Sequence, residues 1–391
     1  KLNYKIMKKI GIYLSVGPHA GGSYQYCLSI IEALNQIKNS EIKFVSFILD
    51  LKWKKILSKE FEVIKLERNT FSERIVSLIR KINLPIGFHK MICKLLSKKI
   101  RIMNNSNCSY IIFPSQEDES GNIQLNSITT IHDLMHRYEG RFKEYTNSEY
   151  KKRELSFKRI SKYSSKIIVD SPTGKKHVME SYNCKSKKIS VLPFTTPKYL
   201  ENSKIVDIYK KYKIPKKKFI FYPAQFWEHK NHINLIKAFN IIKKKEANIN
   251  LVLVGKEKNN LENVKQKIEK YNLKNDVFIL GYINQSDIFT FYKKAAMMCF
   301  ASSAGPTNIP PLEAMSLGCP LVCSNAYGMK RQVGNGGLTF NPNSPTDIAN
   351  KIYKCLKSKK LNKIVIKNAL KQYSKFNNNS FKTNLKKIIF S

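Results

Sequence analysis

Acidic residues are scarce in this chain. Its 391 residues include 28 Asp and Glu against 70 Lys and Arg, which gives a formal charge of +42. A protein that reads nucleic acid would place basic runs among aromatic residues or carry a recognisable binding motif. Neither is present, so we predict no nucleic-acid partner. Lysine and asparagine are instead scattered, as in residues 243–245 and 377–379, which is typical of a coding bias. The charge therefore favours attraction of anions without identifying the fold.

Several other features are missing. The eight cysteines show no paired C-x-x-C spacing, which favours reduced thiols in a cytoplasmic protein. No apolar run is long enough to span a bilayer, and no signal peptide is recognisable. No acidic cluster suggests a metal site, so we expect neither a metal nor another cofactor. Residues 1–6 precede Met7, which resembles an ordinary start, so these six residues are either an addition or a segment that the sequence leaves unassigned.

Short apolar runs alternate with helical segments along the chain. This pattern predicts parallel sheets with helices on both faces. In the first half we expect strands at 10–14, 43–49, 110–113, 127–131, 166–170 and 189–192. In the second half we expect them at 219–222, 250–254, 277–280, 297–300, 320–323 and 337–340. The proline-flanked segment 193–197 interrupts the alternation and predicts a domain boundary near residue 200.

The most informative segment runs from Gly305 to Asn325. Pro310 and Pro311 suit the first turn of a helix, which Gly318 would end before a buried strand. This places Glu313 in the first turn, where a carboxylate can accept hydrogen bonds from a ribose diol. The alternative is that Glu313 is only a charge favoured by the helix dipole.

Other motifs accompany this segment in a fixed order. Tyr222–Asn231 is a loop with a Lys-Asn pair after a strand, and Gly255 and Gly281 each follow a later strand. In the first half, Gly21-Gly22 and Ile131-His132-Asp133 each follow a strand as well. Together these motifs resemble the donor-site signature of retaining GT-B glycosyltransferases, in particular glycosyltransferase family 4. The resemblance covers nearly the whole chain.

The resemblance implies a fold and a domain organisation. It implies an α/β GT-B protein with two Rossmann-like domains facing each other across a cleft. Residues 1–199 would form the acceptor-binding domain and residues 200–375 the nucleotide-sugar-binding domain. A last helix within 376–391 would cross back to the N-terminal domain.

The resemblance also implies catalytic roles for three residues. Lys230 would stabilise the negative charge that grows on the departing diphosphate. His132 would face the donor sugar, and Glu313 would bind the ribose hydroxyls. Asp133 would orient His132 or bind the acceptor. The alternative for Lys230 is an ordinary surface lysine, and the alternative for His132 is a structural histidine.

A second group of residues would bind the donor. Glycines let the backbone approach a diphosphate closely, and helix N–H groups can bind it. Residues 305–309 form the expected sugar-recognition loop. The donor-binding set is Gly21, Gly22, Gln225, Asn231, Gly255, Gly305, Thr307, Asn308, Ile309 and Arg331.

The chain departs from the family pattern at two positions. Gly305 stands where the family has its first Glu, so Thr307 and Asn308 would have to contact the sugar. Gln225 stands where the family has an Arg, and its amide can donate a hydrogen bond but carries no charge. Arg331, at a position where many relatives carry an acid, could supply the missing charge.

Residues 74–103 mix apolar side chains with eight cations and contain no acid. We expect this segment either to lie on an anionic membrane surface or to form two ordinary helices in a lysine-rich protein. The cations are Arg74, Arg80, Lys81, Lys90, Lys94, Lys98, Lys99 and Arg101.

We therefore expect an enzyme that moves a hexose from a nucleoside diphosphate sugar to a hydroxyl with retention of configuration. The acceptor would be a glycan or lipid-linked glycan of surface polysaccharide biosynthesis, at the cytoplasmic face of the membrane. Two alternatives remain open. One is a nucleotide-sugar epimerase, and the other is a non-catalytic GT-B protein that binds sugars or polyanions.

Overall fold

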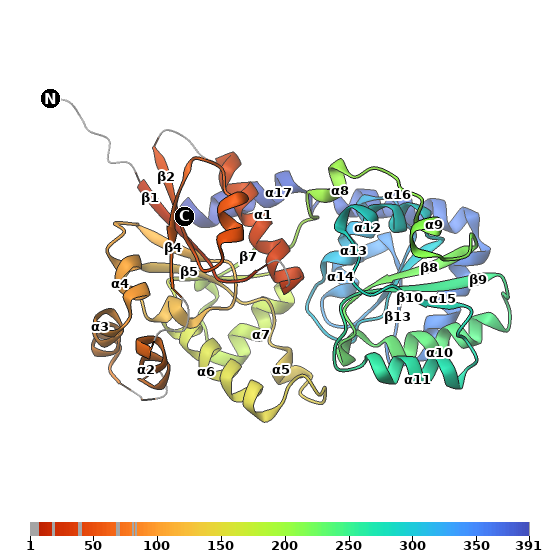
Figure 1. Ribbon diagram of the computed structural model, residues 1–391, viewed down its shortest axis with the longest axis horizontal. Helices are drawn as coiled ribbons and strands as arrows, with labels where there is room; N and C mark the ends of the chain where they lie inside the picture. Colours follow the sequence, from red (N-terminus) through yellow and green to blue (C-terminus); the bar gives the residue numbers. More distant parts are fainter. Residues whose placement is uncertain are drawn as a thin grey trace. The chain divides into compact units, whose positions relative to one another are not determined.

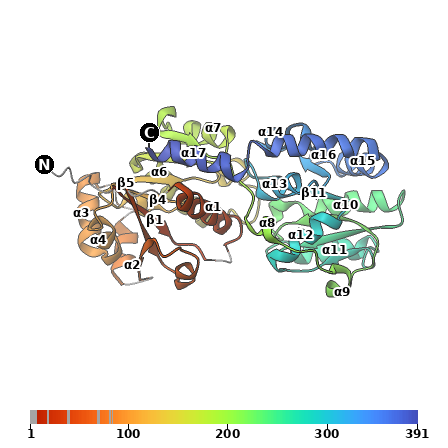
Figure 2. The ribbon, with the colours of Figure 1, turned by 90° about the horizontal axis from the view of Figure 1, so that it is seen from above.

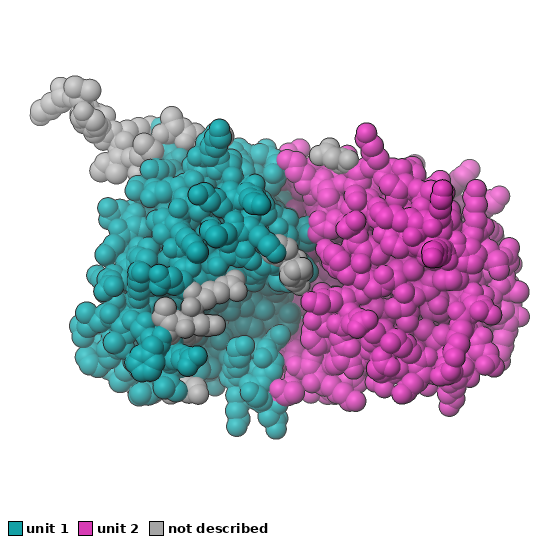
Figure 3. Space-filling model, in the orientation of Figure 1, with its two compact units in different colours: residues 1–134, 147–193, 381–391 teal, residues 135–146, 194–380 magenta. Residues whose placement is uncertain are grey.

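The computed structural model describes residues 8–17, 20–37, 41–67, 71–79, 82 and 84–390. Residues 1–6, Met7, Arg80 and Lys81, on which predictions were made, lie outside this range. The chain forms two compact units (Figure 3). Unit 1 comprises residues 1–134, 147–193 and 381–391, and unit 2 comprises residues 135–146 and 194–380.

The chain enters the long segment of unit 2, residues 194–380, at residue 194. The sequence analysis placed this domain boundary near residue 200. Phe194 packs against the core of unit 2. Thr195 and Thr196 are hydrogen-bonded to Asn378 and Tyr373, at 2.8 and 2.6 Å. The link that follows the last strand of unit 1 therefore joins unit 2 as soon as that strand ends.

Unit 1 contains a seven-stranded sheet (Figure 1) in which every neighbouring pair is parallel. The spatial order is β3-β2-β1-β4-β5-β6-β7. The strands are β1 (Lys8–Leu14), β2 (Ile42–Ile48), β3 (Phe61–Lys65), β4 (Tyr110–Phe113), β5 (Asn126–Thr130), β6 (Lys166–Val169) and β7 (Ile189–Val191).

The helices of unit 1 connect these strands. They are α1 (Gly22–Ile37), α2 (Phe71–Ile79), α3 (Ile86–Leu96), α4 (Lys98–Asn104), α6 (Asn147–Tyr163) and α7 (Pro172–Tyr182). Short 3₁₀ turns occur at η2 (Leu51–Lys55), η3 (Asp118–Gly121) and η4 (Ser186–Lys188).

Residues 74–103 form parts of three helices, so the expectation of two was wrong. Pro85 precedes α3, and proline cannot donate the backbone hydrogen bond that a continuous helix would need. Ser97 ends α3 and caps α4, because its side chain accepts a hydrogen bond from the N–H of Ile100. These helices pack on one face of the sheet, where Cys93 and Met103 meet core residues of β1, β2 and β4.

Unit 2 contains a six-stranded sheet, also parallel at every pair, in the order β10-β9-β8-β11-β12-β13. The strands are β8 (Lys218–Pro223), β9 (Ile249–Val254), β10 (Val277–Ile279), β11 (Met297–Phe300), β12 (Leu321–Ser324) and β13 (Leu338–Phe340).

The helices of unit 2 follow the same alternation. They are α5 (Met135–Tyr138), α8 (Tyr199–Asn202), α9 (Ile208–Tyr212), α10 (His232–Lys243), α11 (Leu261–Lys270), α12 (Gln285–Lys294), α13 (Ile309–Ser316), α14 (Met329–Val333), α15 (Pro345–Lys357) and α16 (Lys359–Tyr373). Two 3₁₀ turns, η5 (Glu228–Lys230) and η6 (Gly334–Gly336), complete the unit.

The last helix, α17 (Asn378–Phe390), returns to unit 1 (Figures 1 and 2). Its buried side chains include Phe381 and Leu385. The Phe381 ring packs edge-on against Tyr26 of α1, and the Lys166 amine donates to the Ile388 carbonyl at 3.0 Å. The return of the C-terminal helix, which the resemblance implied, is confirmed.

Both sheets reverse their winding direction at the strand that comes first in the chain. In unit 1 the reversal lies between β1 and β4, and in unit 2 it lies between β8 and β11. Open parallel sheets bind ligands outside the carboxyl ends of the strands at this point. The loops after these four strands are therefore the places to search for a site. Within the described residues, no helix is long and apolar enough to cross a membrane.

Candidate active site

The loops after β8 and β11 meet at the reversal point of unit 2. The Lys230 amine donates to the side-chain oxygen of Asn308 at 3.0 Å, and the ammonium lies 5.6 Å from the centre of the Phe300 ring. The two backbones are also joined, because the N–H of Ser303 donates to the His229 carbonyl at 2.8 Å. The structure thus brings together Lys230 and the predicted sugar-recognition loop, which lie about 80 residues apart in the chain.

Asn231 fixes the turn that carries Lys230. It adopts a left-handed conformation with φ of 60°, which asparagine tolerates better than most residues. Its side-chain amide donates to the carbonyls of Ala301 and Pro342, at 3.1 and 2.7 Å. These bonds give Asn231 a structural role beside the donor-binding role predicted for it.

Asn308 is held from its other side by Gln332 of α14. The N–H of Asn308 donates to the Gln332 side chain at 3.1 Å, and the Gln332 amide donates to the Asn308 carbonyl at 2.8 Å. Sequence reasoning missed Gln332 and selected its neighbour Arg331. Arg331 lies on the exposed face of α14, whereas Gln332 is one of the buried residues of that helix. The helix therefore directs Gln332 inward toward the loop.

Two glycines are required by the backbone of this site. Gly305 has φ of +104°, and a Cβ added there would lie 2.9 Å from the Asn308 amide nitrogen. A Cβ on Gly255, after β9, would lie only 2.1 Å from the Ala224 carbonyl oxygen. Gly305 therefore stands where the family Glu is expected in a conformation that side chains rarely adopt. Thr307 lies half-buried in the same loop, and Ile309 is the first residue of α13.

Gln225, which replaces the family Arg, is engaged locally. Its side-chain oxygen accepts a hydrogen bond from the Trp227 indole at 2.9 Å. The amine of Lys258 lies 4.7 Å from the centre of that indole ring, a cation–π distance. A cation is therefore held beside the position from which the family arginine is missing.

Glu313 lies in the second turn of α13, so its expected place in the first turn was wrong. The helix begins at Ile309, because extended Asn308 precedes it as the N-cap. Pro310 and Pro311 occupy early positions and have no N–H. The helix start therefore offers fewer free donors to an anion than the sequence analysis assumed.

The Glu313 carboxylate is 5% exposed and is bound by two tyrosines. Tyr199 of α8 donates to Oε1 at 2.9 Å, and Tyr292 of α12 donates to Oε2 at 2.7 Å. Burial raises the pKa of Glu313, and the hydrogen bonds from Tyr292 and Tyr199 oppose that rise. Each carboxylate oxygen has two lone pairs, so a hydroxyl of a ligand can still bind. Neither tyrosine was predicted, because both are remote in sequence.

The predicted residues of unit 1 lie at its own reversal point or beside it. Gly21 has φ of +59°, and Gly22 opens α1. His132 follows β5 and is 8% exposed. Its backbone N–H donates to the side-chain oxygen of Gln116 at 3.1 Å. Burial lowers the pKa of His132 to about 4, although Asp133 and the Pro114 carbonyl act in the opposite direction. The histidine is therefore neutral at physiological pH.

Asp133, in the loop after β5, forms an ion pair with a residue of α6. Its carboxylate lies 3.6 Å from the Arg153 guanidinium of α6. This ion pair anchors the chain directly after His132. The role expected for Asp133, orienting His132 or binding the acceptor, is thus joined by a structural one.

A carboxyl group that sequence reasoning missed occupies the reversal point of unit 1. Glu117 follows β4 and is hydrogen-bonded through Oε1 to the Ser15 hydroxyl, which follows β1. Its Oε2 is buried and has no hydrogen-bond partner among the described residues. Burial, more than the neighbouring Glu119, raises the pKa of Glu117 to about 8. Its place after a β run was the only available signal, and acids in such loops are common.

One segment of the first half of the chain, residues 135–146, packs in unit 2 beside the Lys230 loop. Glu144 accepts hydrogen bonds from the His229 ring and the Asn259 amide. The N–H of Lys143 donates to Glu228 at 3.0 Å. Burial alone would raise the pKa of Glu144, but the bonds from His229 and Asn259 hold it at about 2. Glu144 therefore acts as an ionised anchor for the turn that carries Lys230.

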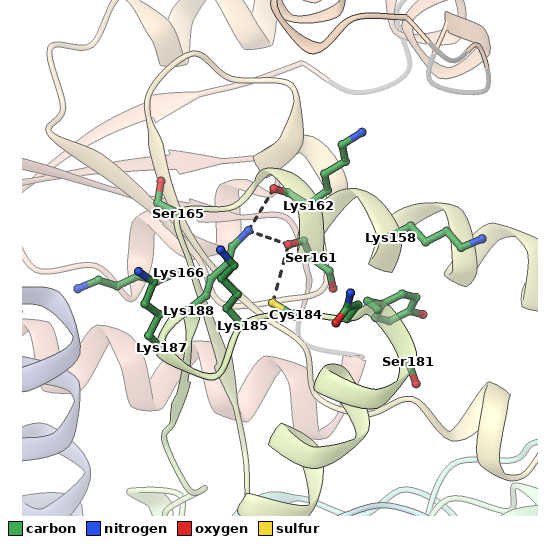
Figure 4. A pocket seen from close by; sticks show the side chains of 12 residues that line it. Lys158, Ser161, Lys162, Ser165, Lys166, Ser181, Cys184, Lys185, Lys187 and Lys188 are labelled. Atoms are coloured by element: carbon green, nitrogen blue, oxygen red, sulfur yellow. Dashed lines mark hydrogen bonds between the residues drawn. The ribbon is translucent and has the colours of Figure 1, made fainter.

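One cavity, of about 830 Å³, is lined by residues of unit 1 alone and by none of the site residues described above (Figure 4). It lies beside the start of β6 and β7, at the opposite end of the sheet from the reversal-point loops. Six of its twelve lining residues are lysines. One of these, Lys188, donates to the carbonyls of Ser161 and Lys162 at the end of α6, at 2.7 and 3.1 Å (Figure 4). The cavity thus borders a helix carboxyl end whose carbonyls are already bound by the Lys188 amine.

Among the described residues, no group of three or more His, Cys, Asp or Glu side chains is arranged to hold a metal ion. All eight cysteines lie among the described residues, where they are buried and form no disulfide bond with one another.

Two parallel sheets, each followed by site loops at its reversal point, and a C-terminal helix that returns to unit 1 define a GT-B fold. Solved structures agree. HepE of Anabaena in complex with UDP and glucose is similar, with a TM-score of 0.72 and 15% identity; the match covers 98% of this chain and 99% of that chain. Sucrose-phosphate synthase from Thermosynechococcus elongatus is also similar, with a TM-score of 0.75 and 17% identity; this match covers 98% of each chain. At such identities the likeness establishes the fold alone.

The sequence of unit 2 matches a known family. Residues 205–372, which make up most of unit 2, match the model of the glycosyl transferases group 1 family. The chain is 27% identical over 221 residues to the O-antigen chain mannosyltransferase RfbU of Salmonella typhimurium, covering 56% of this chain and 57% of that protein. It is 32% identical over 145 residues to the uncharacterized glycosyltransferase YqgM of Bacillus subtilis, covering 36% and 38%. The chain thus matches about half, or less, of the length of these curated relatives.

Proposed function

We propose that this protein is a glycosyltransferase that moves a hexose from a nucleoside diphosphate sugar to a hydroxyl of a glycan or lipid-linked acceptor in surface polysaccharide biosynthesis. The observation that carries the proposal is the contact of Lys230 with Asn308 at the reversal point of unit 2. It places a cation next to polar groups suited to a sugar, within the region that matches the group 1 glycosyltransferase family. The similarity to RfbU and another O-antigen chain mannosyltransferase supports polysaccharide synthesis and a mannosyl donor.

In this proposal, unit 2 binds the donor. Lys230 neutralises the diphosphate, and Asn308, fixed by Gln332, contacts hydroxyls of the sugar. Glu313 binds the ribose diol with the lone pairs that Tyr199 and Tyr292 leave free. Preorganised donors of this kind stabilise charge as it develops in the transition state.

The proposed reaction retains configuration and uses no metal. The bond between the sugar C1 and the diphosphate oxygen breaks while the acceptor oxygen bonds to C1 on the same face. The acceptor proton passes to the departing phosphate oxygen, so the donor supplies its own base. We assign the acceptor to unit 1, where Glu117 at the reversal point can bind an acceptor hydroxyl. His132, neutral because it is buried, remains the unit 1 residue predicted to meet the donor sugar.

We also propose that helices α2–α4 bring the enzyme to an anionic membrane surface that holds lipid-linked acceptors. Large apolar side chains are exposed there, among them Phe71 at 78% and Leu95 at 68%. Exposed apolar groups next to cations are typical of surfaces that lie on anionic lipid. Lys99 does not contribute, because it is 11% exposed and paired with Glu73 and Glu119 at 3.2 and 2.9 Å.

The transfer reaction is tested with purified protein, UDP-, GDP-, ADP- and dTDP-hexoses, and octyl α-mannoside as the acceptor. We expect one nucleotide class to yield a disaccharide product whose new linkage has the donor's anomeric configuration by proton NMR. Lys230→Ala should abolish most of the product. If a donor binds but no product forms, the non-catalytic alternative is favoured, and an inverted linkage would contradict retention.

Membrane attachment is tested by co-sedimentation with vesicles that contain or lack phosphatidylglycerol. The Phe71→Ser/Leu95→Ser variant should lose binding to the anionic vesicles. Ile364→Ser is the matched control, because Ile364 of α16 is 50% exposed on unit 2. Equal binding by the wild type and the double variant would contradict the proposal.

A further inference from the structure

A second cavity, of about 630 Å³, lies wholly within unit 2 and is lined by neither Lys230, Asn308 nor Glu313. Its walls come from the start of α10, from α11, and from residues 141–142 of the segment that crosses from the first half of the chain. The volume lies in the range of about 300–1,000 Å³ usual for small-molecule sites.

The lining of this cavity is unusually rich in carboxamides. Six of the thirteen lining residues are Asn or Gln, whereas only three are apolar or hydroxylic. A carboxamide offers donors and an acceptor side by side, which matches sugar hydroxyls that also donate and accept. The six are Asn231, Asn234, Asn260, Asn263, Gln266 and Asn343.

Asn260 provides an independent sign of a missing ligand. It is 3% exposed, and its amide nitrogen is buried without a hydrogen-bond partner among the described residues. Its side-chain oxygen is already used, because the Asn263 amide donates to it at 3.0 Å. The backbone of Asn260 is also fixed, since its N–H donates to the Phe226 carbonyl at 3.0 Å. An unsatisfied buried donor costs about 1–3 kcal/mol, and a ligand hydroxyl would remove that cost once a shift of the Asn260 side chain opened its amide to the cavity.

The charges around the cavity favour a neutral ligand over a phosphate. Three cations and one carboxylate line it, but none of the cations lies at its buried floor. Arg141 is committed to Glu139, with 2.8 Å between guanidinium and carboxylate, and Lys270 is exposed. Phe142 and Ile233 add apolar contact area of the kind that ring C–H groups can cover.

We propose that this cavity is a carbohydrate-binding site, adjoining the predicted donor site through Asn231, that holds one or two sugar units of a glycan chain. Asn260 donates to a sugar hydroxyl at the floor, and Asn263 and Gln266 bind hydroxyls at the rim. The site is built partly from residues 141–142, so the crossing segment contributes to it. Its occupancy does not require that sugar transfer occur.

The test is saturation-transfer NMR on the full-length protein without any nucleotide, with mannotriose, maltotriose and inorganic phosphate as probes. We expect the wild type to bind at least one trisaccharide. Asn263→Ala/Gln266→Ala, which changes exposed residues of α11 only, should weaken that binding at least fivefold. Asn260→Leu, of similar side-chain size, should do the same. Asn350→Ala is the control, because Asn350 is an exposed amide on α15, and it should leave binding within twofold.

The outcomes separate this inference from the proposed function. Failure of the wild type to bind either trisaccharide, or equal binding by the rim variant, would overturn the inference. So would displacement of the bound trisaccharide by phosphate or by nucleoside diphosphate, because the cavity would then be an anion or donor site. Loss of nucleotide-sugar binding in calorimetry would overturn only the proposed function, since trisaccharide binding is measured without donor.

Discussion

Replacement of Lys230 by alanine tests the donor site most directly. In the structure the Lys230 ammonium is 3.0 Å from the side-chain amide oxygen of Asn308, and in the proposed function a diphosphate binds to this ammonium. A hydrogen bond to a charged group contributes about 1.5–3 kcal/mol. At about 1.4 kcal/mol per factor of ten, Lys230→Ala should weaken binding of the diphosphate by roughly 10- to 150-fold.

An upper bound follows from electrostatics. Two unit charges 4 Å apart attract by about 4 kcal/mol at the effective dielectric constant of a protein surface. Part of this is lost because both groups must shed water, so the measured loss should stay below that figure. Added salt should reduce the difference between wild type and variant, since screening weakens the same attraction.

The assay is isothermal titration calorimetry with UDP and GDP, and with uridine and guanosine. The variant should bind the nucleoside as the wild type does, because a nucleoside has no phosphate. Lys351→Ala is the control, because it also removes a lysine charge from unit 2, at a position on α15 that was not assigned to the site. The Lys351 amine lies 4.0 Å from the carboxylate of Asp347. If Lys230→Ala leaves UDP and GDP affinity unchanged, or weakens nucleoside binding equally, the assignment of Lys230 to the diphosphate is refuted.

Three further predictions concern the residues around this site. Gly305→Glu, which restores the family residue, should lower the free energy of unfolding in urea by about 1–3 kcal/mol and should weaken donor binding. The reason is that φ of +104° and the Asn308 amide, 2.9 Å from an added Cβ, leave no room for a side chain. A gain in transfer rate would contradict this prediction. Tyr292→Phe should cost about 1–3 kcal/mol in the same experiment by leaving a buried oxygen of Glu313 with one donor fewer, and the loss should be non-additive with Glu313→Gln in a double-mutant cycle; additive losses would contradict the contact. The pKa of His132 is about 4 in the folded protein, below its ordinary value of 6.5. Its contribution to the free energy of unfolding is therefore complete above pH 6.5 and is lost as the pH falls toward 4. Between pH 7 and 5 the wild type should lose about 2 kcal/mol more than His132→Gln, and equal losses in the two proteins would refute the shift.

Much of the fold was predictable because the buried strands are nearly continuous apolar runs. Strand β4 was expected at its observed bounds, and α17 lies within residues 376–391, where a last helix was expected. Strand β3 was missed, because Glu62 and Lys65 interrupt its apolar pattern and most of its residues are only half-buried. A strand at the edge of a sheet needs less apolar surface than a central strand, so its sequence signal is weaker.

Only those contacts of the site that follow from the sequence of strands and loops along the chain were predictable. Lys230 and Asn308 each follow a strand, and parallel strands that neighbour each other bring their carboxyl ends together. The partners that hold Glu313 could not be inferred, because Tyr199 lies 114 residues away and its contact depends on how α8 packs. The start of α13 was placed too late, because the extended N-cap, Asn308, was not recognised in a loop rich in small residues.

Residues 135–146 have a consequence for protein engineering. The main chain passes from one unit to the other four times, after residues 134, 146, 193 and 380. A chimera that joins an acceptor half and a donor half from different parents at residue 194 would combine a foreign Glu144 with the native His229, and so would disturb the turn that carries Lys230. Exchange of donor specificity should therefore move three segments together, residues 135–146 with 194–380 and a matched terminal helix. A truncated chain that ends at residue 193 would carry residues 135–146 with no surface to fold against.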